Sequence, residues 1–366
     1  YLLFFMIAFV TNLCNPMAVI VKNNFAMSNF AAQLGNAANF IAYAAMGIPA
    51  GMLLKKIGYR KTALVAILIG FIGVFLQYMS GWAAIQSFWV YLAGAFTAGF
   101  CMCMLNTVVN PMLNTLGGGG NKGNQLVQFG GVCNSLAAVL VTIIMGSLIA
   151  DATKAQIADA TPALMIALGV FAFAFLVLLL VKIPEPAQEN EGDKAKDKKY
   201  SAFSFRHFNL GILAIFLYMG VEVGVPTYVM QYLTTSPDAT TPGLGINASI
   251  VGMIVAVYWL LMLVGRLLGG MIGGKVSSRA QITGVSILCL VLVLLGMFLP
   301  TDVMVKMPGI DWATLTIMTA QVPVGVFALI LVGLCTSVMW GGIFNMAVEG
   351  LGKYTSIASG AFMTMV

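Results

Sequence analysis

Three asparagines at helical spacing lie in the middle of a long apolar stretch. Asn106, Asn110 and Asn114 follow one another at intervals of four residues, so on a helix their amides share one face. An amide donates and accepts hydrogen bonds at once, which is the chemistry that a polyhydroxylated ligand needs. Pro111 removes a backbone donor beside that face. In a membrane helix such groups face the bundle interior or a water-filled path, so this face is a candidate binding site.

One carboxylate, Glu222, lies well inside an apolar stretch in the second half of the chain. An ionised carboxylate is costly in hydrocarbon, so Glu222 must be protonated, paired or in contact with cavity water. Tyr218 lies one turn earlier, and Pro226 leaves the Glu222 carbonyl without its helical donor, so we expect a break in this helix. Two roles remain open: a group that exchanges a proton, or a buried acid that binds hydroxyl groups or neighbouring side chains without titrating.

The composition identifies the class of protein. The 366 residues are 60% apolar and 8% charged, whereas soluble domains carry about 25% charged residues. Apolar segments of about 20 residues, the length that crosses a bilayer, recur along the chain. We therefore predict an all-α polytopic membrane protein that contacts the lipid bilayer. Its spans should lie near 1–22, 33–55, 61–80, 86–114, 125–150, 162–182, 208–233, 247–273, 280–300 and 319–348, with a further one from about 355.

The basic residues of the loops predict the orientation in the membrane. Alternate loops hold almost all of them, and the opposite loops hold only Lys22, Lys154 and Lys306. Because basic loops stay on the cytoplasmic side, we expect a cytoplasmic (inner) membrane protein with its N-terminus inside. The basic set is Lys55, Lys56, Arg60, Lys61, Lys122, Lys182, Lys194, Lys196, Lys198, Lys199, Arg206, Lys275, Arg279 and Lys353.

A charged, proline-containing stretch divides the chain into two helical sets. It has mixed charge and no bulky apolar residue, which is typical of a disordered or weakly helical linker. We predict an N-terminal six-helix bundle over 1–183, a cytoplasmic linker over 184–207 and a C-terminal bundle over 208–366, the layout of two repeats. The chain starts and stops within apolar runs, so we expect the last helices to be truncated.

Four stretches carry a resemblance to a known family. They are Ile48-Pro49-Ala50-Gly51 with the basic residues that follow, Asn110-Pro111, Cys133-Asn134-Ser135, and the segment from Gly342 to Gly360. Together they resemble the major facilitator superfamily, and within it the fucose:proton symporter family of sugar transporters. The resemblance implies twelve helices in two six-helix domains around a central sugar cavity. It also implies monosaccharide substrates such as fucose, glucose or galactose, usually driven by protons.

The same resemblance assigns roles to several amides. Asn12 and Asn134 match asparagines of the family's sugar site, whereas Asn15 and Asn106 stand where the symporter has two acids tied to proton coupling. A glutamine of that family is replaced by Gly131, and Gln128 one turn earlier is its candidate substitute. Because both family acids are amides here, the coupling role is expected to move to Glu222.

The complete candidate site therefore combines both arguments. Trp259 is included because indole stacks on the apolar face of a pyranose, although contact with lipid and packing within the protein are equal alternatives. Membrane helices also use amides to hold one another together, which is the alternative for every asparagine here. We predict Arg266 to be a gate or an inter-helix anchor, with an inner-gate loop formed by Lys55, Lys56, Arg60 and Lys61. The predicted substrate-binding set is Asn12, Asn15, Asn106, Asn110, Gln128, Asn134, Tyr218, Glu222, Trp259 and Asn345.

Other classes of function lack support in the sequence. The six cysteines and the single histidine, His207, show no metal-ligand spacing. There is no catalytic triad, no Walker spacing around the glycine-rich loop at Gly117, and no face suited to nucleic acid. We therefore expect neither an enzyme nor a cofactor, metal or nucleic-acid partner.

The predicted function is that of a monomeric secondary active transporter. It would import a monosaccharide, a hexose or deoxyhexose, together with a proton, by alternating access of its two bundles. Sugar uniport or sodium-coupled transport is the first alternative, and a transporter-like sensor that does not translocate its ligand is the second.

Overall fold

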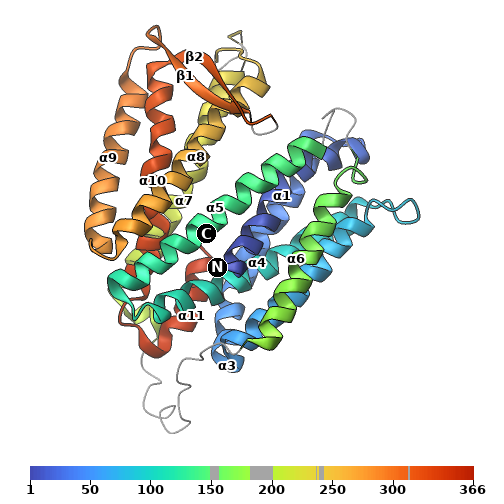
Figure 1. Ribbon diagram of the computed structural model, residues 1–366, viewed down its shortest axis with the longest axis vertical. Coiled ribbons are helices and arrows are strands. Elements are labelled where there is room, and N and C mark those ends of the chain that lie inside the picture. The colour runs from blue at the N-terminus through green and yellow to red at the C-terminus, as the bar shows by residue number, and fades with distance from the viewer. Residues whose placement is uncertain (149–155, 182–200, 236, 239–242, 312–313) are drawn as a thin grey trace.

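The computed structural model describes residues 1–148, 156–181, 201–235, 237–238, 243–311 and 314–366, apart from the side chains of a few residues within helices. Its helices pack in two groups (Figure 1). The first contains α1 (Leu2–Asn24), α2 (Asn29–Ala32), α3 (Leu34–Met79), α4 (Phe88–Leu116), α5 (Gly120–Leu148) and α6 (Thr161–Leu180). The second contains α7 (Arg206–Thr234), α8 (Ala248–Gly273), α9 (Ser278–Phe298) and α10 (Val324–Val348). The predicted polytopic helical architecture is confirmed.

A short eleventh helix joins the two groups. Helix α11 (Thr355–Met363) follows α10 and packs mainly against α3 and α4 of the first group. Glycines make this contact close: an added Cβ on Gly360 would lie 2.3 Å from the Gly47 carbonyl oxygen, and one on Gly51 would lie 2.6 Å from that of Ser356. Small residues allow this approach of helix backbones, which is how helices associate in a bilayer.

A glycine separates two predicted spans, 33–55 and 61–80, which were expected to be joined by a short loop. The label α3 covers both, and its two helical parts meet at Gly58, whose φ of 82° and ψ of 175° are not helical. A residue with a Cβ rarely adopts this φ, so glycine permits the sharp change of direction. Just beyond it, the Thr62 hydroxyl donates to the Gly58 carbonyl at 2.7 Å.

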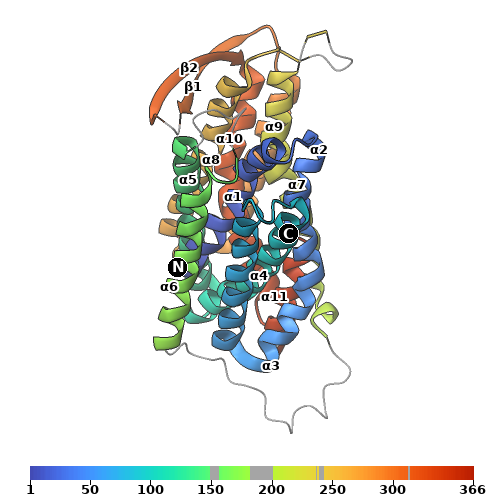
Figure 2. The ribbon, with the colours of Figure 1, turned by 90° about the vertical axis from the view of Figure 1, so that its right-hand side faces the viewer.

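The segment before α10 corrects one predicted span. Residues 319–323, assigned to a helix from the sequence, belong to a strand. Strands β1 (Met304–Asp311) and β2 (Thr316–Pro323) form an antiparallel hairpin at one end of the helices (Figure 2). The side chains of Met307 on β1 and Val322 on β2 are buried. Pro323, the last residue of β2, is the N-cap of α10. The predicted all-α class is thus supplemented by one small sheet.

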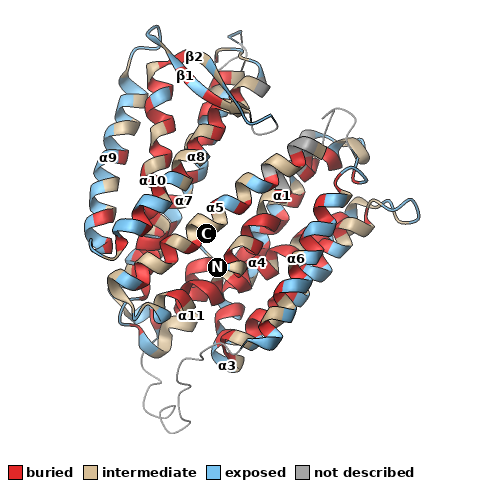
Figure 3. Cartoon of the chain, viewed as in Figure 1, coloured by how far each residue is buried: buried red, intermediate tan, exposed pale blue. Residues whose placement is uncertain are grey.

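The burial pattern places α4 and α10 at the centre of the two groups. Both helices are buried along most of their length, whereas α9 is largely exposed (Figure 3). The exposed side chains of α9 are apolar and include Leu288, Leu290 and Val291, as expected for a surface that faces lipid. The asparagine-bearing helix α4 is therefore an interior helix of the first group.

The predicted linker lies mostly outside the described residues, which resume at 201. From there the chain forms a short 3-10 helix, η2 (Ala202–Ser204), and enters α7 at Arg206. A second such turn, η3 (Gly352–Tyr354), leads into α11. The division into domains at 183 and 208 stays a prediction, although the packing of the helices in two groups agrees with it.

Replacing Gly58 tests the kink in α3. Gly58→Ala should lower the free energy of unfolding by about 1–2 kcal/mol, because a Cβ is strained at positive φ. Thermal unfolding of the purified protein in detergent measures the effect. Gly169→Ala is the matched control, since an added Cβ there meets no atom within 4 Å. Equal midpoints for the two variants would contradict this account.

Candidate functional site

Glu222 is paired with the one arginine of α8, in the C-terminal third of that helix. The Arg266 Nη2 lies 3.6 Å from the Glu222 Oε1, and the two side chains are 13% and 11% exposed. This distance fits an ion pair but exceeds that of a hydrogen bond. The buried Tyr218 hydroxyl is close enough to interact with the carboxylate, but its geometry does not meet that of a full hydrogen bond. The carboxylate therefore keeps the capacity to take up a proton or to accept from a hydroxyl group.

Arg266 also contacts the other helix group. Its Nη1 donates to the Ser135 Oγ at 2.7 Å and to the Gly131 carbonyl at 3.2 Å, both on α5. An added Cβ on residue 131 would lie 3.2 Å from the Arg266 Cδ, so glycine leaves room for the arginine stem. We call the set Glu222, Arg266, Gly131 and Ser135 the Arg266 bridge. It joins α7 and α8 of the second group to α5 of the first.

The proline in α7 does not break the helix. α7 runs without interruption from Arg206 to Thr234 past Pro226, so the predicted break is wrong. The Glu222 carbonyl, which lacks its helical donor, accepts from the Tyr258 hydroxyl of α8 at 3.1 Å. That hydroxyl also lies 3.2 Å from the Thr336 Oγ1 of α10. The sequence signal for this contact was the donor missing at Pro226, which required some side chain to replace it but did not identify Tyr258.

The asparagine row of α4 divides among three kinds of partner. Asn106 Nδ2 donates to the Tyr43 hydroxyl of α3 at 2.9 Å. Asn110 is fully buried, and its Nδ2 donates to the Asn106 carbonyl of its own helix at 2.9 Å. The Asn110 Oδ1 has no hydrogen-bond partner among the described residues, which leaves one acceptor for a ligand or water. Asn114 instead donates across to Asn345 of α10.

Amide side chains close one end of the space between the two groups. Gln128 Nε2 donates to the Val338 carbonyl of α10 at 2.9 Å, and Gln125 Nε2 donates to the Gly270 carbonyl of α8 at 3.0 Å. With the contact of Asn114 to Asn345, these bonds define what we call the closed end. In Figure 1 the two groups come together near α11 and spread apart toward β1 and β2. Gln128 therefore lies between the bundles rather than facing an open space.

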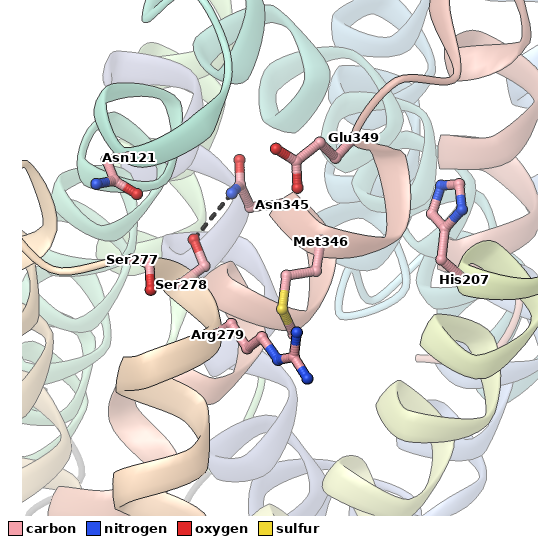
Figure 4. A pocket seen from close by; sticks show the side chains of 8 residues that line it. All are labelled: Asn121, His207, Ser277, Ser278, Arg279, Asn345, Met346 and Glu349. Carbon is pink, nitrogen blue, oxygen red and sulfur yellow. Dashed lines mark hydrogen bonds between the residues drawn. The ribbon is translucent and has the colours of Figure 1, made fainter.

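Asn345 lies on the α11 side of the candidate site. It is nine residues beyond Thr336 on α10, roughly 13 Å further along the helix axis, and its Nδ2 donates to the Ser278 Oγ at 2.9 Å. Figure 4 shows Asn345 and Ser278, which line a pocket of about 420 Å³. The lining residues are Asn121, His207, Ser277, Ser278, Arg279, Asn345, Met346 and Glu349. The structure thus places Asn345 at the closed end and not with the Arg266 bridge.

The remaining predicted ligands occupy varied surroundings. Asn12 is half-buried and its Nδ2 donates to the Ala8 carbonyl at 2.8 Å. Asn134 is half-buried on α5, beside Ser135 of the Arg266 bridge. Trp259 is 42% exposed and its ring meets that of Tyr258 edge-on. The side chain of Asn15 lies outside the described residues.

The predicted inner-gate loop lies at the kink of α3. Lys55, Lys56 and Lys61 are exposed. Arg60 donates to the Leu178 carbonyl at 2.9 Å and to that of Leu179 at 2.7 Å, and so caps the C-terminus of α6. This contact stays within the first group, so the gating role of the loop remains a prediction.

The described residues contain no group of three histidine, cysteine or acidic side chains that could hold a metal ion. The cysteines on α4, Cys101 and Cys103, are buried in the apolar core, where they pack as small hydrophobic residues. The candidate site therefore consists of amides, hydroxyl groups and one ion pair.

Comparison with known proteins gives consistent matches along the whole chain. The sequence pattern of the Major Facilitator Superfamily matches residues 1–366. A glucose/galactose transporter of Brucella abortus is 27% identical over 365 residues, which cover 98% of this chain and 81% of the relative. The L-fucose-proton symporter of Escherichia coli is 23% identical and covers 99% of this chain and 81% of its own. The crystal structure of FucP in the outward conformation superposes with a TM-score of 0.80 at 20% identity, covering 100% of this chain and 86% of that one.

Removing one hydroxyl tests the support of α7 beside Glu222. Tyr258→Phe leaves the Glu222 carbonyl buried without a donor, which should lower the free energy of unfolding by about 1–3 kcal/mol. Thermal unfolding in detergent measures the loss. Tyr228→Phe is the control, because Tyr228 is on α7, the helix that carries Glu222, and is 58% exposed. If both variants are as stable as the parent, the Tyr258 hydroxyl does not support this carbonyl.

Proposed function

Because the chain belongs to the Major Facilitator Superfamily, we propose that it is a secondary active transporter that imports a monosaccharide together with a proton. The relatives described above are named for glucose, galactose and L-fucose, which are all hexoses or deoxyhexoses. It is not proposed as an enzyme, since family and relatives alike are transporters. The bundles would alternate in exposing a site near the middle of the membrane.

The chemistry of the site suits a sugar. Amides and a carboxylate match the hydroxyl groups of a monosaccharide, which donate and accept hydrogen bonds in turn. Asn110 offers a buried unpaired acceptor, and Glu222 keeps free acceptor capacity beside Tyr218. Asn134 adds a half-buried amide from α5, next to Ser135. We propose that the sugar contacts these groups from the space between α4, α5 and α7.

Glu222 is the group that supports proton coupling. It is 9% exposed, and its counter-charge, Arg266, also contacts α5 of the first group. The positions of the family acids, Asn15 and Asn106, carry amides that cannot take up a proton at ordinary pH. Asn106 is moreover engaged with Tyr43. The single observation that carries the proposal is this buried carboxylate, paired with an arginine that bridges the two bundles.

The distribution of basic residues supports an orientation. Lys122 precedes the first contacts of the closed end on α5, and Lys275 follows those on α8. Because basic loops stay on the cytoplasmic side, we propose that the closed end is cytoplasmic. The described conformation would then be closed to the cytoplasm, with the N-terminus inside and the hairpin β1–β2 outside. A monomer is sufficient for this cycle, since both bundles belong to one chain.

Uniport of a sugar on the same scaffold is the alternative that a specific observation favours. The amides at Asn15 and Asn106 remove both carboxylates of the symporter pattern. In that case Glu222 would be a fixed partner of Arg266, and sugar flux would ignore the proton gradient. Sodium-coupled transport and a sensor that binds sugar without translocating it are further alternatives, which the uptake assay described next also tests.

Uptake into proteoliposomes tests proton coupling directly. An inward proton gradient should drive accumulation of labelled glucose, galactose or fucose above the external concentration. Glu222→Gln should abolish accumulation but retain exchange of internal for external sugar, because a neutral amide imitates the protonated acid. Asp302→Asn, an exposed carboxylate at the hairpin end, is the control and should accumulate sugar normally. Accumulation by Glu222→Gln equal to the parent would contradict the coupling role.

Sugar affinity tests the proposed ligands. Asn134→Ala should weaken binding of the transported sugar by about twofold to tenfold, the range expected from one lost hydrogen bond. A binding screen over fucose, galactose, glucose and amino sugars identifies that sugar first. Asn209→Ala, on the exposed start of α7, is the matched control. Unchanged affinity in Asn134→Ala would remove this residue from the site.

A further inference from the structure

Arg266 has two sets of partners that belong to different helix groups. Its Nη2 faces the Glu222 carboxylate of α7, and its Nη1 donates to the Ser135 hydroxyl and the Gly131 carbonyl of α5. α7 and α8 pack in the same group, whereas α5 packs in the other. Any rocking of the bundles that opens the closed end must pull Arg266 away from α5, but it can leave the pair with Glu222 intact.

The charge of Glu222 sets how well Arg266 is compensated in the closed arrangement. When Glu222 is ionised, the guanidinium has a counter-charge on one side and two neutral acceptors on the other. When Glu222 is protonated, only the neutral acceptors remain for a buried cation, which is a costly arrangement. Arg266 does not release its own proton under these conditions. Protonation of Glu222 should therefore favour an arrangement that gives Arg266 access to water.

The surroundings of Glu222 contain no rival charge in the described part of the chain. α8 presents Arg266 and the Tyr258 hydroxyl, which is bound to the Glu222 carbonyl. α10 presents the neutral Thr336, bound to Tyr258, and α7 itself presents the neutral Tyr218. Arg266 is thus the counter-charge through which a proton on Glu222 acts on its neighbours.

We propose that the Arg266 bridge is a proton-sensitive latch between the two bundles: ionised Glu222 holds Arg266 against α5, and protonation releases it. This inference deepens the proposed function and rests on it, because it states how protonation of Glu222 changes the contact between the two bundles. Arg266 is a positioning residue in this account, since it acts on the bundles through Glu222, Ser135 and Gly131.

The latch gives the coupling its direction. With the closed end at the cytoplasm, an outward-facing carrier with ionised Glu222 stays closed. Uptake of an external proton and a sugar loosens the bridge, and the closed end opens. After release of both to the cytoplasm, ionised Glu222 again favours closure, so the empty carrier returns. A ligand or proton shifts such an equilibrium only through its different affinity for the two states, and the bridge provides that difference.

Gly131 is part of the same device. An added Cβ would lie 3.2 Å from Arg266 Cδ and 3.5 Å from its Nε. A longer side chain at this position would take the space of the guanidinium and compete for its acceptors. Glycine at 131 and arginine at 266 are therefore one complementary pair across the bundle interface.

The distance between the two bundles measures the latch without any transport. Spin labels would replace Lys122 and Lys275, which are exposed at the α5 and α8 ends of the closed end. Ketone-bearing residues carry the labels, because the chain has six native cysteines. In the purified protein without sugar, the ratio of short to long distances should fall by about tenfold from alkaline to acid pH, as expected from losing one charge-assisted contact.

Three variants separate the latch from a merely structural contact. Glu222→Gln should show the acid distance distribution at every pH. Ser135→Ala should shift the distribution toward long distances but keep its dependence on pH, because the pair with Glu222 remains. Gly131→Gln should shift it in the same way by displacing Arg266. Asp302→Asn is the control and should match the parent.

The outcomes distinguish this inference from the proposed function. A distribution that ignores pH in the parent, or that keeps its pH dependence in Glu222→Gln, overturns the latch. If the distances respond to pH through Glu222 but a proton gradient does not drive sugar uptake, the latch stands and symport fails. If symport requires Glu222 while the distances ignore pH, symport stands and the latch fails.

Discussion

A guanidinium buried between helices must find acceptors on every side, and this constraint organises the centre of the molecule. Arg266 is 13% exposed and meets it with partners from two bundles. Breaking such a pair by removing one partner typically costs about 3–5 kcal/mol, since the other charge remains buried. The same cost makes the arrangement sensitive to a proton. A contact of this kind can hold two rigid bodies together in one charge state and release them in another.

The contacts of the closed end itself are neutral and can open. Gln125 and Gln128 bind backbone carbonyls rather than charged groups, and Asn114 binds another amide. Glycines on α8 allow α5 to pack closely against it: an added Cβ on Gly273 would lie 3.3 Å from the Gln125 Cα. Neutral hydrogen bonds each contribute about 1 kcal/mol, and water can replace them when the bundles separate. Among the contacts described above, the Arg266 bridge is the charged one, and those of the closed end are neutral.

The sequence was sufficient for features that depend on length and local pattern. Apolar stretches predicted the helices, and Gly58 marks the kink where two of them join. Pairings between distant residues could not be predicted from the sequence. Glu222 and Arg266, for example, are 44 positions apart, and their approach depends on how α7 packs on α8. Spacing placed Asn114 on the same face as Asn106, yet packing sends it to Asn345 on the other bundle. The hairpin before α10 was missed because its apolar residues extend the run of the helix, although threonines and Pro323 favour a strand end there.

Whether Glu222 changes its protonation state as the bundles rearrange is the central claim, and infrared difference spectroscopy observes it directly. A protonated carboxyl group has a carbonyl stretch that an ionised one lacks. Acidification of the sugar-bound protein should produce this band, and the band should be missing in Glu222→Gln but present in Asp302→Asn. A parent spectrum in which no band depends on Glu222 at any pH, with and without sugar, would contradict the account.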